Sequence, residues 1–316
     1  MVDAPFLPSE EGRVDDRTGL GYAMVMVAAT LFAVNGTVSK VVLGSGLSSL
    51  ELTQIRSTGA AVGFIAFLLI FARSRLRVGR RELLFLVVFG ITGIGFVQWL
   101  YFIAIDHLPV GIALLIQFLG PLFVALFARF VYREDIRRRI WVALVLSIVG
   151  LGVVVEFWSG LAFSTLGITA ALGAAFALAA YILMAERERK HRDPVSLSFY
   201  GFLFAALFWA VVNPLWRFPW DVLGDTVSLQ GNLDQHTAPV WLLVGFIVVI
   251  GTMITFTLLT GALRHIPATR ASIVATLEPV IATVVAWAWL GQSFGTAQLL
   301  GGAVVLAGIV LAQTAR

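Results

Sequence analysis

The sequence contains no cysteine among its 316 residues, and only 13% of them are charged. The missing cysteine excludes disulfide bonds and thiolate metal sites, and the four histidines lie far apart without zinc-binding spacing. We therefore expect no metal and no cofactor. The low charge excludes an ordinary soluble domain, in which about 25% of residues are charged. Instead, 59% of residues are hydrophobic and the mean hydropathy is +0.94, values typical of an integral membrane protein.

Ten apolar windows are long enough to cross a bilayer, whose core of about 30 Å requires roughly 20 apolar residues per helix. The windows are 21–42, 50–72, 83–105, 110–131, 140–157, 165–185, 195–216, 239–262, 268–290 and 296–314. They predict an all-α integral membrane protein with ten transmembrane helices. Residues 1–20 are acidic where a secretory signal would be basic, so we interpret them as an N-terminal tail in the cytoplasm.

Arginine and lysine are concentrated in alternate loops, namely those after the second, fourth and sixth windows. Basic loops are retained on the cytoplasmic side of a membrane. The pattern therefore predicts a multi-pass protein of the cytoplasmic membrane with both termini in the cytoplasm. These loops also account for the net charge of +4, so the charge does not require a nucleic-acid partner.

The two halves of the chain match at a constant offset of 158 residues. Among the identical pairs are Gly93 with Gly251, His107 with His265, Pro109 with Pro267, Pro121 with Pro279 and Gly150 with Gly308. We therefore expect two five-helix repeats, residues 21–157 and 165–314. Five crossings per repeat place the second copy upside down in the membrane. Inverted repeats are typical of secondary transporters, whose substrate site lies near the midplane between the repeats.

Two segments resemble a known family. "LPVGIALLIQFLGPLFVALFARFVYRED" and "IPATRASIVATLEPVIATVVAWAWLGQSF" are similar to the two signature segments of EamA-type, ten-helix members of the drug/metabolite transporter superfamily, and the resemblance spans about residues 20–314. It implies export of small metabolites, since similar proteins are associated with amino acids, other metabolites, aromatic compounds and cationic drugs. One position departs from the family. An acidic residue usually follows "LG" in the second segment, where this chain has Gln292, while Glu134 keeps the acid in the first half.

Glu278 and Pro279 interrupt the ninth window about 15 Å from its start, close to the bilayer midplane. One interpretation is a proton-coupling site or a site for a substrate amine; the alternative is a protonated acid that bonds between helices. Pro279 and its counterpart Pro121 lack an amide hydrogen, which frees the carbonyls of Ala275 and Gln117 and predicts kinks that act as hinges.

Three charged residues lie toward one end of the first two windows: Lys40, Glu51 and Arg56. In one interpretation Arg56 or Lys40 binds a substrate carboxylate. In the other, a Lys40–Glu51 or Arg56–Glu51 ion pair closes a gate or joins the helices, which long basic side chains near a helix end readily do.

Further polar and aromatic residues lie deep enough in the windows to line a central cavity. Each is also a candidate for an interhelical hydrogen bond or, for tryptophan, an interfacial position. The candidates are Asn35, Gln98, Gln117, Tyr101, Tyr181, Tyr200, Trp99 and Trp287.

These features together predict a secondary transporter, an exporter of small metabolites such as amino acids, aromatic ones included, that works by alternating access between inverted repeats. Efflux of cationic drugs is the alternative. A membrane enzyme that acts on a lipid-linked substrate is disfavoured because the sequence shows no nucleophile constellation and the 217–238 loop has no catalytic spacing. The expected partners are a small-molecule substrate, the lipid bilayer and protons. The chain is expected to act as a monomer or a homodimer.

Overall fold

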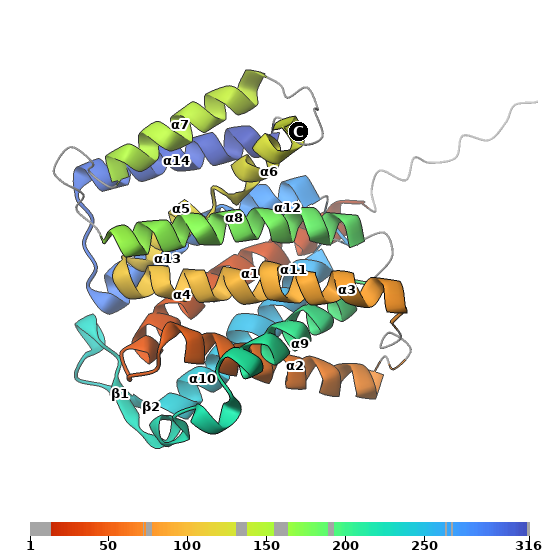
Figure 1. Cartoon of the computed structure of the whole chain (residues 1–316). Coiled ribbons are helices and arrows are strands. Elements are labelled where there is room, and N and C mark those ends of the chain that lie inside the picture. Colours follow the sequence, from red (N-terminus) through yellow and green to blue (C-terminus); the bar gives the residue numbers. More distant parts are fainter. Residues whose placement is uncertain are drawn as a thin grey trace, which may run out of the picture.

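The computed structural model describes residues 14–71, 73, 78–130, 138–154, 164–188, 193–262, 264–266 and 268–314. Within them the chain is a bundle of helices that lie side by side, with one short hairpin (Figure 1). Glu134, Pro267, residues 1–13 and most residues of the basic loops lie outside the described part of the chain.

The first half of the chain forms eight helical segments. They are α1 (Val14–Leu43), α2 (Ser49–Phe71), α3 (Arg80–Val88), the π-helix η3 (Phe89–Phe96), α4 (Val97–His107), α5 (Val110–Gln117), α6 (Gly120–Phe130) and α7 (Arg138–Val154). α1 begins earlier than the expected window at residue 21, so part of the expected tail is helical.

The second half repeats this plan and adds a loop. Its helices are α8 (Thr165–Glu188), α9 (Pro194–Val212), α10 (Val240–Val248), the π-helix η8 (Val249–Ile254), α11 (Thr255–Ala262), α12 (Ala268–Ala275), α13 (Leu277–Leu290) and α14 (Thr296–Thr314). The loop between α9 and α10 holds β1 (Thr226–Ser228) and β2 (Thr237–Pro239), which pair antiparallel with Val227 opposite Ala238.

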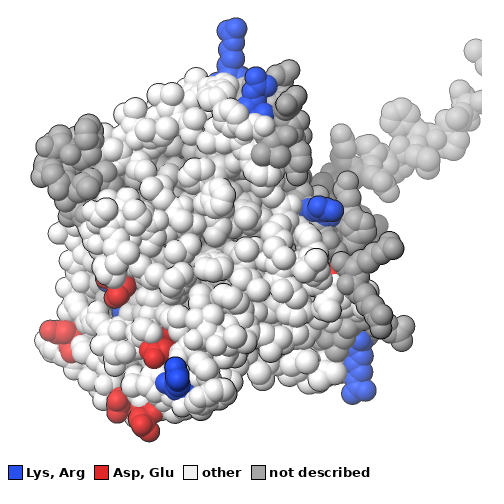
Figure 2. All heavy atoms as spheres, viewed as in Figure 1, with Lys and Arg blue, Asp and Glu red and all other residues white. Residues whose placement is uncertain are grey.

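Nine helical stretches in the described part of the chain are long and apolar enough to cross a membrane. α7 covers the remaining expected window with 17 described residues. Large apolar side chains are exposed along the bundle, among them Val211 and Phe71, as expected for a surface that contacts lipid. On the face shown in Figure 2, Asp and Glu gather at the hairpin end, whereas Lys and Arg lie mainly at the other end.

Helices of the first half pack against helices of the second half. α2 lies along α9, α4 along α8 and α7 along α14, and α1 contacts both α11 and α13 (Figure 1). The α7–α14 contact is close because it is made by glycines: a Cβ on Gly150 would lie 2.8 Å from the Gly301 carbonyl oxygen. Small residues permit this approach between membrane helices. The two halves therefore share one interior.

Breaks in helical geometry recur in the two halves at the same offset as the sequence matches. The π-helices η3 and η8 end at Phe96 and Ile254, which are 158 residues apart. α5 and α12 end at Gln117 and Ala275, again 158 apart. These two residues carry the carbonyls that Pro121 and Pro279 leave without an amide donor, so the positions of both breaks agree with the kinks that the prolines predict.

Candidate substrate-binding site

Arg56 of α2 is the buried charge around which the candidate site is built. Only 5% of its surface is exposed, and its guanidinium carbon lies 5.6 Å from the ring centre of Phe102 in α4, a cation–π distance. Its Nε donates a hydrogen bond of 2.9 Å to Thr252 Oγ1 in η8. Within the described residues this is the only hydrogen bond of Arg56. Four of the five guanidinium N–H donors are thus left for other partners.

Glu278 and Tyr101 complete the electrostatic environment of Arg56. Both interact electrostatically with the guanidinium, yet the described residues contain no Arg56–Glu278 ion pair within 4.0 Å. Glu278 lies in the first turn of α13, where the helix dipole favours a negative charge. Its carboxylate has no hydrogen bond to a described residue. An acid and a base therefore lie near each other without direct pairing.

Asn35 and Gly36 of α1 connect this site to neighbouring helices. Asn35 Oδ1 lies against the backbone of η8, since a Cβ added to Gly251 would be 2.1 Å from it. Gly36 allows the Tyr101 hydroxyl to approach, because a Cβ there would be 2.5 Å from that oxygen. Residues from α1, α2, α4, η8 and α13 thus meet in one polar cluster, which we call the central cluster: Asn35, Arg56, Tyr101, Thr252 and Glu278.

Several buried polar atoms in the first half have no hydrogen-bond partner in the described part of the chain. They include Asn35 Oδ1, Ser57 Oγ, Gln98 Oε1 and Gln117 Oε1. An unsatisfied buried polar atom costs about 1–3 kcal/mol, which favours a role in binding a polar ligand or water. Gln98 lies one helical turn before Tyr101 and Phe102 in α4, while Gln117 lies at the end of α5.

Apart from Tyr101, the expected aromatic residues do not belong to the central cluster. Tyr181 stacks on Phe89 at 5.3 Å, and the ring centres of Phe199 and Tyr200 are 4.8 Å apart. The ring centres of Trp99 and Trp209 are 5.5 Å apart. These rings belong to a second apolar core, to which α2, η3, α4, α8 and α9 contribute.

Trp287 lies 62% exposed at the surface of α13. The expectation that it lines a cavity is therefore wrong in this structure, because the turn of α13 that carries it presents the ring outward.

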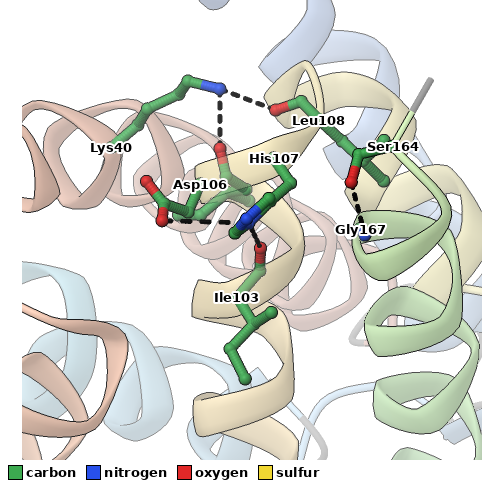
Figure 3. Close-up of polar contacts among 8 residues, drawn as sticks. Lys40, Ile103, Asp106, His107, Leu108, Ser164 and Gly167 are labelled. Carbon is green, nitrogen blue, oxygen red and sulfur yellow. Dashed lines mark hydrogen bonds and ion pairs between the residues drawn. The ribbon is translucent and has the colours of Figure 1, made fainter.

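The expected ion pairs of Lys40, Glu51 and Arg56 do not form. Lys40 Nζ instead donates to the carbonyl oxygens of Ile105 at 2.6 Å and Leu108 at 2.7 Å, at the end of α4 (Figure 3). Glu51 accepts hydrogen bonds from the backbone and the hydroxyl of Ser48, both at 2.8 Å. Each charge satisfies a helix terminus, which always has unpaired backbone groups, so the charges need no pairing with each other.

Figure 3 also shows two acid–base neighbours at this end of α4. His107 Nδ1 lies 3.8 Å from Asp106 Oδ2 and 3.0 Å from the Ile103 carbonyl oxygen. Both side chains are partly exposed. They lie outside the central cluster, and no group of three residues that could hold a metal ion occurs among the described residues.

Polar contacts tie the hairpin end together, and of the side chains that make them only Gln292 was singled out in the sequence. Gln54 and Asn213 exchange two hydrogen bonds, one of them 3.0 Å from Asn213 Nδ2 to Gln54 Oε1. Asn232 donates to the Ala288 carbonyl at 3.1 Å, and Gln292 Oε1 accepts from the Val110 amide at 3.2 Å. Gln54, Asn213 and Gln292 lie inside or directly after apolar windows, whereas Asn232 lies in the 217–238 loop.

Two hollows on the surface lie away from the central cluster. A pocket of about 510 Å³ is lined by Gly44, Ser45, Gln230 and residues 225–228 at the hairpin end. An apolar groove of about 250 Å³ lies between α3, α6 and α8. Neither of these two hollows is lined by Arg56 or Glu278.

The fold defines a multi-pass helical membrane protein with a polar cluster inside an otherwise apolar bundle. Comparison with protein families specifies the class: the EamA-like transporter family matches residues 19–156 and again residues 165–314. The chain therefore belongs to the EamA-like transporter family.

Individual relatives agree with this family. The chain is similar to an uncharacterized transporter of Archaeoglobus fulgidus, with 28% identity over 295 residues that cover 92% of this chain and 96% of that protein. It is 28% identical to the threonine/homoserine exporter RhtA of Escherichia coli over 81% of this chain and 80% of the exporter. A protein crystal structure with 21% identity shares the fold, with a TM-score of 0.58 and coverage of 94% and 96% of the two chains.

Proposed function

We propose that the protein is a secondary transporter that exports small zwitterionic metabolites, amino acids above all, by alternating access between inverted repeats. Family membership supports transport, and the name of RhtA supports amino acids as the class. The observation that carries the substrate class is the separation of Arg56 from Glu278. An α-amino acid has a carboxylate for the first and an ammonium group for the second.

The chemistry of the central cluster favours a ligand with both charges. The free terminal N–H groups of Arg56 match a carboxylate, which guanidinium binds in a bidentate way. Glu278 has no hydrogen-bond partner in the described chain and matches an ammonium. Buried opposite charges left apart are unfavourable unless other groups compensate them. A zwitterion between them supplies both missing partners at once.

A cationic drug fits the same cluster less well. Glu278 would attract it, but the buried guanidinium of Arg56 would repel it at short range, where charge interactions in a membrane protein are weakly screened. The aromatic rings that could stabilise a cation pack against one another instead. The described residues give no specific feature in favour of drug efflux.

The name of the exporter RhtA supports transport out of the cell. We propose that the protein is oriented in the cytoplasmic membrane with both termini in the cytoplasm. The basic end and the acidic end of the described surface agree with it (Figure 2). Protons are the proposed coupling ion and Glu278 their site, because it is the membrane-embedded acid of the central cluster.

Counterflow in proteoliposomes tests the substrate class. Threonine, homoserine and aromatic amino acids are offered beside threonine methyl ester, which lacks the carboxylate, N-acetylthreonine, which lacks the ammonium, and a quaternary organic cation. We expect exchange of the zwitterions and little exchange of the three probes that lack one charge. Arg56→Gln should abolish the preference for a carboxylate. Exchange of the organic cation with no exchange of any amino acid would replace this proposal by drug efflux.

A further inference from the structure

One hydrogen bond determines how the guanidinium of Arg56 is presented. A carboxylate binds guanidinium either side-on, through Nε and one terminal nitrogen, or end-on, through both terminal nitrogens. Thr252 Oγ1 occupies Nε at 2.9 Å. The side-on edge is therefore closed to a ligand, and the end-on edge with both terminal nitrogens is the one that remains.

The Thr252 hydroxyl has a fixed polarity. It donates its own hydrogen to the Ile247 carbonyl oxygen at 2.8 Å, five residues earlier in the π-helical turn. Its lone pair is thus directed to the Nε–H of Arg56. Thr252 is fully buried, so water does not compete for either bond.

The π-helical turn does not need this hydroxyl in order to form. Thr255 makes the same kind of bond, 2.7 Å to the Ile250 carbonyl oxygen five residues earlier, but it has no hydrogen bond to Arg56. In the first half, the residues 158 positions earlier are Ile94 and Val97, which have no hydroxyl, and η3 still forms. π-helical turns occur frequently at functional sites. The hydroxyl of Thr252 is therefore explained by Arg56 rather than by the backbone.

We propose that Thr252 is the positioning residue for substrate recognition: it holds Arg56 so that both terminal nitrogens face a substrate carboxylate, and it connects the occupied site to the η8 turn. This inference rests on the proposed function, since it assigns the carboxylate to Arg56. When the substrate displaces the guanidinium, the hydrogen bond to Arg56 displaces the Thr252 hydroxyl. This changes the hydrogen bond of Thr252 to the Ile247 carbonyl. Substrate binding should then alter the hydrogen bonding of η8.

The test compares Thr252→Val, Thr252→Ser and Thr255→Val in proteoliposome counterflow. Valine keeps the shape of threonine and removes the hydroxyl. Loss of a hydrogen bond to a charged group corresponds to about a tenfold effect or more. We therefore expect Thr252→Val to raise the half-saturation concentration of the amino acid about tenfold while the maximal exchange rate changes little. Thr252→Ser should restore the wild-type value. Thr255→Val loses an equivalent backbone bond and should match wild type.

Hydrogen–deuterium exchange of peptides that span residues 247–257 gives a readout independent of transport. Addition of substrate at a concentration that saturates each variant should change exchange in wild type and in Thr255→Val, and not in Thr252→Val. The positioning role would be overturned, while the proposed function stands, by either of two results. One is an equal half-saturation concentration in wild type and Thr252→Val. The other is an equal rise of the half-saturation concentration in Thr252→Val and Thr255→Val. Failure of wild type to exchange any amino acid would overturn the proposed function itself.

Discussion

The two halves of the chain share their backbone breaks but differ in the side chains at those breaks. Both halves have a π-helix and a proline-induced break at positions 158 residues apart. Yet Glu278 corresponds to Gly120, and Thr252 corresponds to Ile94. Duplication thus supplies a symmetric framework, whereas Glu278 and Thr252 have no equivalent side chain at the matching positions of the first half.

The unequal distribution of charge explains why the site needs both halves. Arg56, Asn35 and Tyr101 come from the first half, and Glu278 and Thr252 come from the second. The contacts of α1 with α13, and of α1 and α2 with η8, bring the two sets together. A movement of one half against the other would therefore change the distance between the base and the acid, which is the change that alternating access requires.

Substitution of Glu278, which has no acidic counterpart in the first half, should have the largest effect on transport. We expect Glu278→Gln to lower amino-acid counterflow at least about tenfold, since it deletes the partner of the substrate ammonium and leaves Arg56 uncompensated. The matched control is Glu51→Gln, because an amide oxygen still accepts the hydrogen bonds that Glu51 receives from Ser48. An equal loss of counterflow in both variants would contradict a special role for Glu278.

The paired prolines test whether the shared framework moves symmetrically. Pro121→Ala and Pro279→Ala each restore an amide donor to the carbonyl four residues earlier, so each should straighten its helix break and slow exchange severalfold. Initial rates of counterflow measure the effect, with the amount of folded protein as the control. If only one variant slows exchange, the hinge belongs to that half alone.

Substitution of Gln292 should have the smallest effect, and this effect is on thermal stability. Its side chain accepts from the Val110 amide at the start of α5, and a carboxylate there would interact more favourably with the helix dipole, by about 0.3–1 kcal/mol. Gln292→Glu should therefore raise the thermal midpoint in detergent slightly, and Gln292→Ala should lower it. A fall of the midpoint in both variants would show that the amide group itself is required.

Much of the fold follows from the sequence because its causes are local. Apolar length predicts the membrane spans, and a proline predicts the loss of one backbone hydrogen bond. The breaks after Gln117 and Ala275 could therefore be placed without a structure. The candidate acid, Glu278, was recognisable because a carboxylate in the middle of an apolar window has a high energetic cost.

The partners of the polar residues were decided by tertiary structure. Lys40 binds carbonyls of α4 instead of Glu51, Trp287 faces outward, and Arg56 is held by Thr252, 196 residues away in sequence. In helices that are apolar on all sides, sequence alone does not specify how each helix is rotated about its axis. Composition and spacing thus determined that the chain is a duplicated membrane bundle. The packing of its two halves decided which charges meet, because only packing fixes those rotations.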